Sequence, residues 1–374
     1  MKTERREMPR QLGGIAGLTI RVLYRSRLLA PLGRLARSVL AARRSVDIRE
    51  LLGGALPRLI SSMQPVEGLP SPETWVVARE AIGVSSLVVA PLGPPGAAPA
   101  AVVKLARSPE VVEELRAHVR AVQALSGDPR IGPWGRYLPD FLALGLTSEP
   151  AAVVERYMVG IPLTRMLRRE PDLAARSISA CLEVIGELHT RTASVVTTAD
   201  HLAAWLDGPL AAVSSLYPAG AWQLSKLGCL GDELRQAVGI NASTPASWIH
   251  GDYTRDNIFL SPDGGEVLGI LDWGSARPVG VAAVDAYLLL LSSAAYRQRR
   301  ALGHVVVDVA RERGPSALDP LWASVEMLPS GRRALVLLTW LQHVAHNLAK
   351  AATYRDHLAW RALNIDVVLR KLVV

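Results

Sequence analysis

Two short stretches rich in polar side chains interrupt a mainly apolar part of the chain, and they constrain its fold most strongly. The first is IHGDYTRDNIFL, residues 249–260, and the second is GILDWGSA, residues 269–276. Apolar runs around them favour short buried strands, which places Asp252, Asn257 and Asp272 in the adjoining loops. Because acidic and amide groups are costly to bury without partners, we predict that these loops form a functional site.

The composition favours a globular protein with a sizeable core. Of the 374 residues, 49% are hydrophobic and 20% are charged, which argues against global disorder. The two cysteines, Cys181 and Cys229, fit neither a disulfide framework nor a zinc site, so a cytoplasmic location is expected. We find no signal peptide and no apolar run long enough to cross a bilayer.

The net charge of +8 is concentrated near the N-terminus. Residues 1–50 contain twelve Lys and Arg against four Asp and Glu, so the rest of the chain is balanced. Nucleic acid is therefore not expected as a partner. LGRLARSVLAARR has an apolar helical face and predicts a basic helical extension over residues 1–70. That face would pack on the protein; a peptide or protein partner and, less favoured, peripheral membrane contact are alternatives.

Two further domains are predicted after GLPSPE, residues 68–73, whose Pro, Gly and Ser content marks a boundary. Residues 71–158 contain five strand-like runs and one helix, Pro109–Ser126. Residues 159–374 are mainly helical apart from the two polar stretches.

The residue types in the polar stretches suit phosphoryl transfer. Carboxylate and amide oxygens are hard ligands for Mg²⁺, which takes one or two carboxylates and adds water and substrate phosphates. In that chemistry a loop aspartate accepts the proton of the attacking hydroxyl, while an asparagine and a second aspartate hold the metal. Lys104 stands in the apolar run AVVKLA, where a charge is costly without a partner and would serve nucleotide phosphates.

Together these residues resemble the aminoglycoside phosphotransferase and choline kinase family. The match comprises Lys104, ERYM at 155–158, HGD at 250–252 with Asn257, and DW at 272–273, within about residues 74–374. The resemblance implies an α+β, protein-kinase-like bilobal fold. A small β-rich N-lobe (71–158) and a larger, mainly helical C-lobe (159–374) would follow the basic extension, with ATP between the lobes.

The resemblance also implies roles for individual positions. Asp252 would be the catalytic base, Asn257 and Asp272 would bind Mg²⁺, and Lys104 would contact the ATP phosphates. No GxGxxG precedes Lys104, so a looser phosphate loop and the hinge would supply the other nucleotide-binding positions: Gly83, Ser85, Ser86, Glu155, Tyr157 and Met158. His250 would order the catalytic loop, and Asp285 and Leu188–His189 would be structural.

Two charged positions leave alternatives open. Glu114 is the expected partner of Lys104 and belongs to the nucleotide-binding set, although spacing from VQALSG puts His118 at the usual position. Arg255 is assigned to the catalytic residues, because it would stabilise the γ-phosphate or bind an anionic acceptor. The alternative for Arg255 is an ordinary ion pair with Asp256.

The C-terminal helices would shape the acceptor pocket, as the resemblance implies. Trp340, His343, Asn347 and Tyr354 are therefore candidates for acceptor contact. His343 and His346 are three residues apart, a spacing that suits metal ligands. No third ligand is apparent, so core or pocket-lining positions are favoured for both.

We therefore predict a Mg²⁺-dependent phosphotransferase that moves the γ-phosphoryl group of ATP, or GTP, to a hydroxyl of a small molecule. An antibiotic, a sugar or another metabolite would be the acceptor. The stretch YRQRRALGHVVVDVARERG is net basic, which argues against a polycationic acceptor. The alternatives are a kinase for Ser or Thr of a peptide in natural-product biosynthesis and a pseudokinase-type binding module.

Overall fold

The computed structural model describes the chain from residue 57 onward, with gaps. The described residues are 57, 59–61, 63, 66–77, 81–82, 87–169, 171–239, 242–311, 331–350 and 352–373. Most of the predicted basic extension lies outside them, as do Gly83, Ser85 and Ser86. Residues 58–374 form one unit by their internal contacts, and the predicted boundaries at 70 and 158 remain predictions. No described helix is long and apolar enough to span a membrane.

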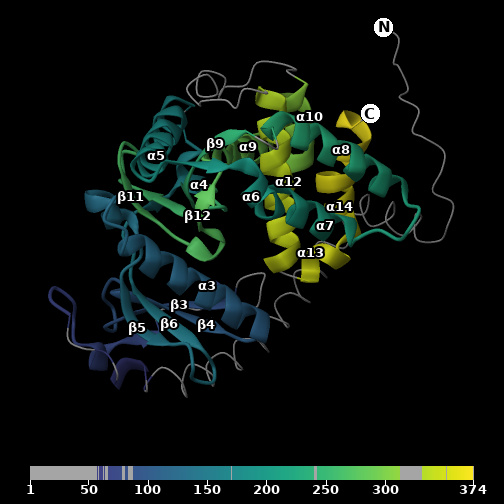
Figure 1. Ribbon diagram of the computed structural model, residues 1–374. Coiled ribbons are helices and arrows are strands. Elements are labelled where there is room, and N and C mark those ends of the chain that lie inside the picture. Colours follow the sequence, from purple (N-terminus) through teal and green to yellow (C-terminus); the bar gives the residue numbers. More distant parts are fainter. Residues whose placement is uncertain are drawn as a thin grey trace, which may run out of the picture. The chain divides into compact units, whose positions relative to one another are not determined.

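An antiparallel sheet forms the centre of the N-lobe (Figure 1). Its strands are β1 (Val76–Val77), β2 (Ala81–Ile82), β3 (Leu87–Gly93), β4 (Ala101–Ala106), β5 (Phe141–Gly145) and β6 (Ala152–Arg156). The order is β1-β3-β4-β6-β5, and β2 also pairs with β3. The sequence predicts five strands; six are present because the run WVVAREAI contributes two short ones, β1 and β2.

Helix α3 (Pro109–Ser126) has the predicted bounds and covers one face of this sheet. Pro109 at its start has no N–H to leave unpaired, and apolar side chains recur at helical spacing after it. The buried face of α3 packs against residues of β4 and of the β6 segment: Ala106, Ala151 and Val153. Side chains alternate along a strand, so the same face also carries Lys104 and Glu155.

The C-lobe is mainly helical, as predicted. Its longer helices are α5 (Pro171–Arg191), α8 (Trp222–Val238), α9 (Ala283–Gln298), α10 (Leu302–Ala310) and α12 (Arg332–Lys350). Shorter α-helices are α4 (Leu163–Met166), α6 (Thr198–Leu202), α7 (Gly208–Ser214), α13 (Ala352–Asp356), α14 (Leu358–Arg361) and α15 (Val367–Leu372). Short segments of other helix types in the C-lobe are η3 (Ala203–Asp207), η4 (Trp273–Ser275) and η5 (Ala362–Asp366), and the N-lobe contains η1 (Pro72–Thr74) and η2 (Gly132–Tyr137).

Two small antiparallel sheets hold the polar stretches between these helices. One has the order β11-β10-β7 and the other β12-β9-β8. Their strands are β7 (Ile161–Pro162), β8 (Ser194–Thr197), β9 (Ser243–Ile249), β10 (Ile258–Leu260), β11 (Val267–Ile270) and β12 (Arg277–Gly280). The loop 250–257 therefore joins β9 to β10, and Asp272 follows β11. Pattern analysis predicts these loops but not β7, β8 or β12, which are too short to show a period.

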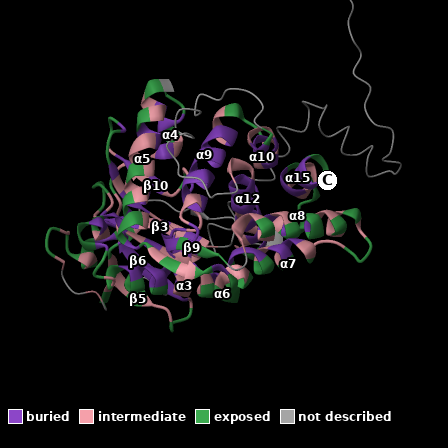
Figure 2. Cartoon of the chain, turned by 45° about the horizontal axis from the view of Figure 1, so that its top comes forward, coloured by how far each residue is buried: buried purple, intermediate pink, exposed green. Residues whose placement is uncertain are grey.

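The C-lobe core is built around α9 and α12 (Figure 2). Every residue of α9 from Val284 to Ala295 is buried, and so is every residue of α12 from Ala334 to Gln342. Full burial of an aliphatic side chain stabilises a fold by about 1.5–3 kcal/mol. The buried middle parts of α9 and α12 therefore hold these helices rigidly in place. Their less buried ends can present side chains to a site.

Gly303 allows α10 to touch the backbone of η5. A Cβ added there would lie 2.4 Å from the Leu363 carbonyl oxygen, whereas one added at Gly186, in α5, would meet nothing within 4 Å. We expect Gly303→Ala to lower the free energy of unfolding by about 1–3 kcal/mol. Gly186→Ala should raise it by roughly 0.5–1 kcal/mol. Urea denaturation of both variants tests this; equal effects would contradict the packing described.

Candidate active site

The two polar stretches meet because β10 and β11 are paired. Ile258 lies opposite Ile270 in the register, and the Leu271 N–H donates to the Asn257 carbonyl at 2.8 Å. This pairing brings the residue that ends the first loop, Asn257, next to Asp272. The sequence places both in loops, and their closeness follows from strand pairing.

The buried carboxylate of Asp285 fixes the start of the loop 250–257. Its Oδ2 accepts the His250 N–H at 2.7 Å, and its Oδ1 accepts the Gly251 N–H at 2.9 Å. His189 Nε2 lies 3.1 Å from Oδ2, and Asp285 is 0% exposed. Three partners satisfy a charge that would otherwise be costly to bury.

His250 links the two loops through both ring nitrogens. Its Nδ1 accepts the Asp252 N–H at 3.2 Å, so the ring proton is on Nε2, which donates to the Leu271 carbonyl at 2.9 Å. Gly251, between them, has φ 76°, and a Cβ there would lie 2.4 Å from the Ser275 carbonyl oxygen. Glycine is thus required here by both backbone conformation and space.

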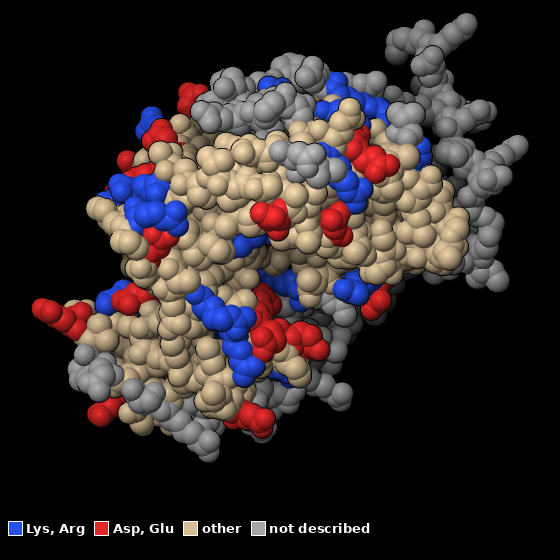
Figure 3. All heavy atoms as spheres, viewed as in Figure 1, with Lys and Arg blue, Asp and Glu red and all other residues tan. Residues whose placement is uncertain are grey.

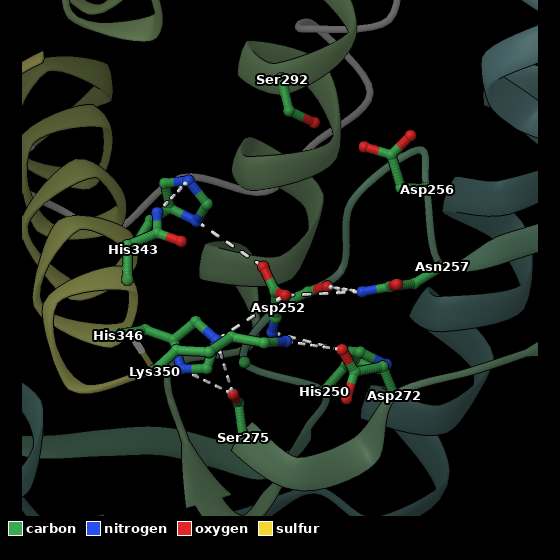
Figure 4. Close-up of polar contacts among 12 residues, drawn as sticks. His250, Asp252, Asp256, Asn257, Asp272, Ser275, Ser292, His343, His346 and Lys350 are labelled. Atoms are coloured by element: carbon green, nitrogen blue, oxygen red, sulfur yellow. Dashed lines mark hydrogen bonds and ion pairs between the residues drawn. The ribbon is translucent and has the colours of Figure 1, made fainter. Parts of the chain in front are cut away.

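Asp252 projects its carboxylate toward two histidines of α12 (Figure 4). His343 Nδ1 lies 3.6 Å from Oδ1, and His346 Nε2 lies 3.7 Å from Oδ2. Burial by itself would raise the pKa of Asp252, but the two imidazoles lower it overall. The carboxylate is therefore ionised and able to accept a proton at neutral pH.

Neighbouring polar side chains orient both histidines. Asn347 Nδ2 donates to His343 Nε2 at 3.0 Å, which leaves the ring proton on Nδ1, facing Asp252. The Ser275 hydroxyl lies 2.9 Å from His346 Nδ1, and burial lowers the pKa of His346. The lack of a third ligand favours core or pocket-lining positions for the two histidines; His343 lines the cavity, and both rings lie beside Asp252.

Asn257 and Asp272 offer oxygens that fit a divalent cation. Asn257 Nδ2 donates to the Asp252 carbonyl at 2.9 Å, so its Oδ1 points away and accepts from no described residue. Asp272 is held at φ 63°, a left-handed conformation rare outside glycine and common at functional sites. No group of three or more His, Cys, Asp or Glu in the described part of the chain could hold a metal alone. A metal here would need phosphate oxygens as well, as Mg²⁺ prefers.

Lys350, the last residue of α12, contacts Asp272 and Glu114 together. Its Nζ lies 2.8 Å from Asp272 Oδ2 and 3.1 Å from Glu114 Oε1. Burial would raise the pKa of Asp272, but Lys350 and then Lys104 hold it well below its usual range. Burial raises the pKa of Glu114 despite the same ammonium.

Lys104 forms its ion pair with Glu155, and the predicted pair with Glu114 is wrong. The distance from Lys104 Nζ to Glu155 Oε1 is 2.7 Å, because the two side chains are diagonal neighbours on paired strands β4 and β6. Burial would raise the pKa of Glu155, but Lys104 and His118 lower it to about 2.

His118 occupies the helix position that a glutamate was expected to fill. Its Nδ1 accepts the Trp273 N–H at 3.0 Å, so its Nε2 carries the proton and donates to Glu155 at 2.8 Å. Burial, and then Lys104, lowers its pKa, which keeps the ring neutral. His118 therefore connects the N-lobe ion pair directly to the segment that carries Asp272.

Arg255 makes contacts within the protein. Its guanidinium donates to the Ser292 carbonyl at 3.1 Å, pairs with Asp256 at 3.2 Å and lies 4.8 Å from the Tyr296 ring centroid. The ion pair with Asp256 is the alternative considered for this residue. These contacts favour a role in holding the loop.

The hinge after β6 has partly used its backbone donors. The Tyr157 N–H donates to the Ala100 carbonyl at 3.0 Å, whereas the Met158 N–H donates to no described residue. Met158 also packs so closely on Gly269 that a Cβ there would lie 2.1 Å from its sulfur. The Glu155 side chain belongs to the ion pair and faces α3.

Asp252, Asn257 and Asp272 open onto one cavity of about 1400 Å³. Of the acceptor candidates, His343, Asn347 and Tyr354 line it. Trp340 does not: it is fully buried and donates to the Asn364 carbonyl at 2.7 Å, so it belongs to the core. On the face shown in Figure 3, acidic and basic side chains gather beside a hollow. Basic residues outnumber acidic ones in the cavity lining: Arg168, Arg169, Arg255, Arg297, Arg299, Arg300 and Lys350 against Glu114, Asp252, Asp256 and Asp272.

A small sheet lobe, a helical lobe and this pair of polar loops define a kinase-like phosphotransferase. The sequence profile of the phosphotransferase enzyme family matches residues 81–328, and the chain belongs to this family. A search of curated proteins gave no significant match.

Solved structures support the fold. A Ralstonia eutropha protein, provisionally assigned as an aminoglycoside phosphotransferase, aligns with TM-score 0.50 and 18% identity over 86% of this chain and 94% of that one. An aminoglycoside phosphotransferase from Streptomyces rimosus aligns with TM-score 0.46 and 17% identity, over 72% and 92%. Glucosamine kinase, in complex with glucosamine, ADP and phosphate, gives 0.41 and 17%, over 80% and 82%. Of these three, the Ralstonia eutropha structure alone reaches a TM-score of 0.50, and this likeness confirms the predicted kinase-like fold.

The pairing of Lys104 with Glu155 should appear as a pH dependence. The Glu155 carboxyl titrates at about 2 when folded, against an ordinary 4.5, so its stabilisation is present above pH 4.5 and lost as pH falls toward 2. We expect Glu155→Gln to cost on the order of 3 kcal/mol at neutral pH. The difference in the free energy of unfolding between this variant and the unsubstituted protein should decrease as the pH falls from 4.5 toward 2. Urea denaturation across pH measures it, with exposed Glu113→Gln as the control; a pH-independent gap would contradict the assignment.

Asp285 offers a second test, of the loop support. Asparagine there would turn an N–H₂ group toward a backbone donor, so Asp285→Asn should cost about 2–3 kcal/mol. Amide exchange at His250 and Gly251 should accelerate by about tenfold or more. Ser293→Ala, on the same helix, removes a buried hydroxyl that has no partner among the described residues and should be nearly neutral. Unchanged exchange in Asp285→Asn would refute the role.

Proposed function

We propose that this protein transfers the γ-phosphoryl group of ATP to a hydroxyl group of a small-molecule acceptor, with Mg²⁺ as the metal. One observation carries the proposal: Asp252, Asn257 and Asp272 come from two paired loops and open onto the same cavity. One carboxylate for the proton and two oxygen ligands for a metal are what this reaction requires of the protein.

Asp252 is the proposed base. Transfer forms a bond from the acceptor oxygen to the γ-phosphorus and breaks the bond from that phosphorus to the bridging oxygen of ADP. The acceptor proton would pass to Asp252, whose lowered pKa keeps it ionised. A weak base suffices because the transition state is loose and the proton is lost late. Asn257, bonded to the Asp252 carbonyl, holds the loop in shape.

Lys104 and the hinge are the proposed nucleotide contacts. Lys104 is held by Glu155, so its ammonium has a fixed direction for the phosphates. The Met158 N–H, which has no acceptor among the residues that the structure describes, supports adenine or guanine recognition beside Tyr157. Gly83, Ser85 and Ser86 remain predicted phosphate contacts outside the described residues.

Asn257 and Asp272 are the proposed Mg²⁺ ligands, together with phosphate oxygens. Bound there, the metal would neutralise charge on the phosphates. Asp272 suits the role because its pKa is held low and its backbone conformation fixes its direction.

A neutral or anionic acceptor fits the cavity better than a polycation. Five arginines line it beyond the catalytic loop: Arg168, Arg169, Arg297, Arg299 and Arg300. Like charges on an acceptor would be repelled by this wall. Tyr296, Tyr354 and Trp360 add aromatic surface on which a ring could pack.

Asp252→Asn tests the proposal. We expect phosphoryl transfer to fall by about 10²–10⁴-fold, because the amide cannot accept the proton, while ATP affinity changes less than about twofold. Transfer from radiolabelled ATP to a panel of hydroxyl acceptors and calorimetric ATP titration measure the two effects. Asp263→Asn, on an exposed turn between β10 and β11, is the matched control. Transfer within tenfold of the unsubstituted protein would exclude Asp252 as the base.

A further inference from the structure

The ammonium of Lys350 lies where two carboxylates from different lobes converge. Glu114 comes from α3 of the N-lobe, and Asp272 follows β11 of the C-lobe. Lys350 reaches both from the end of α12, at 3.1 Å and 2.8 Å (Figure 4 labels Lys350 and Asp272). Its side chain is 22% exposed, so water screens the three charges only in part.

Neither carboxylate has another cation bonded to it among the described residues. Lys104 is engaged by Glu155, and the nearest histidines face Asp252 or Glu155. Without Lys350, Glu114 and Asp272 would leave two negative charges close together in a half-buried place. Such an arrangement is costly, and it attracts a divalent cation.

The Lys350 ammonium contacts one carboxylate oxygen of Asp272, which is a proposed metal ligand. Lys350 holds Asp272 Oδ2, while Asp272 Oδ1 is hydrogen-bonded to no described residue. A divalent cation at Oδ1 would gain attraction from Asp272 but meet repulsion from the nearby ammonium. Nucleotide phosphates would restore the missing negative charge.

We propose that Lys350 is a built-in cation of the metal site. It neutralises Glu114 and Asp272 in the nucleotide-free protein and makes Mg²⁺ binding depend on the nucleotide phosphates. The site thereby selects the metal–nucleotide complex over the free metal ion. This inference rests on the proposed function for the identity of the ligand, but its test needs no phosphoryl transfer.

Lys350→Met in the full chain is the direct test, with Mn²⁺ as the probe. Without nucleotide, we expect the variant to bind Mn²⁺ at least about tenfold more tightly than the unsubstituted protein, measured by electron paramagnetic resonance. Its Tm in EDTA should fall by about 5 °C, and Mg²⁺ alone should restore most of the loss. Mg²⁺ alone should leave the Tm of the unsubstituted protein nearly unchanged.

Two controls separate charge from shape. Lys350→Arg keeps the cation and should bind Mn²⁺ within about twofold of the unsubstituted protein. Lys226→Met, on α8, removes a lysine elsewhere and should change neither quantity. If Lys350→Met folds poorly, the double variant Glu114→Gln/Lys350→Met removes one of the two opposing carboxylates and should recover Tm in EDTA.

Two outcomes would overturn the inference. The first is Mn²⁺ affinity of Lys350→Met within twofold of the unsubstituted protein. The second is a Tm loss that Mg²⁺ does not restore. Loss of the proposed function would appear instead in the Asp252→Asn experiment, so the two failures are distinguishable.

Discussion

The site depends on one buried carboxylate, Asp285. It accepts the N–H groups of His250 and Gly251, and its own helix, α9, is buried almost throughout. The loop 250–257 thus begins at a point fixed by the core of the C-lobe. The positions of Asp252 and of the Asn257 amide, further along the loop, depend on this fixed start. A loop with free ends could not hold a carboxylate to the accuracy that phosphoryl transfer demands.

The charges of the site form one ion pair and one group of three, and His118 connects them. Lys104 is matched with Glu155 on the sheet, and Lys350 is matched with Asp272 and Glu114 at the lobe boundary. His118 joins these groups through Glu155 and the Trp273 N–H. Each of these buried charges therefore has a partner, and the direct neighbours of the Asp252 carboxylate among the described residues are two imidazole rings and the Asn257 amide.

Local sequence predicted much of this molecule. The bounds of α3 are those expected because Pro109 and the apolar spacing act within the segment itself. HGD, Asn257 and DW lie together because they sit at the ends of short paired strands. The prediction that Lys104 pairs with Glu114 is wrong. The actual contact with Glu155 is diagonal across two paired strands, and it depends on a strand register that the sequence pattern does not fix.

Distant contacts account for the rest of what the sequence could not predict. Lys350 lies 78 residues from Asp272, and no periodicity in α12 points to that contact. The spacing of His343 and His346 does reveal a shared helix face, although not what that face meets. Trp340 also lies three residues from His343, but its side chain points into the core. Helix α12 is long enough to contact both the core and the site.

The bond between the Trp273 N–H and His118 has a further consequence. The imidazole can accept this bond only while Nδ1 is bare, since Nε2 already carries the proton given to Glu155. A second proton on the ring would turn two N–H groups against each other across the lobe boundary. A doubly protonated His118 could therefore no longer accept the Trp273 N–H, and α3 would lose this hydrogen bond to the segment that carries Asp272.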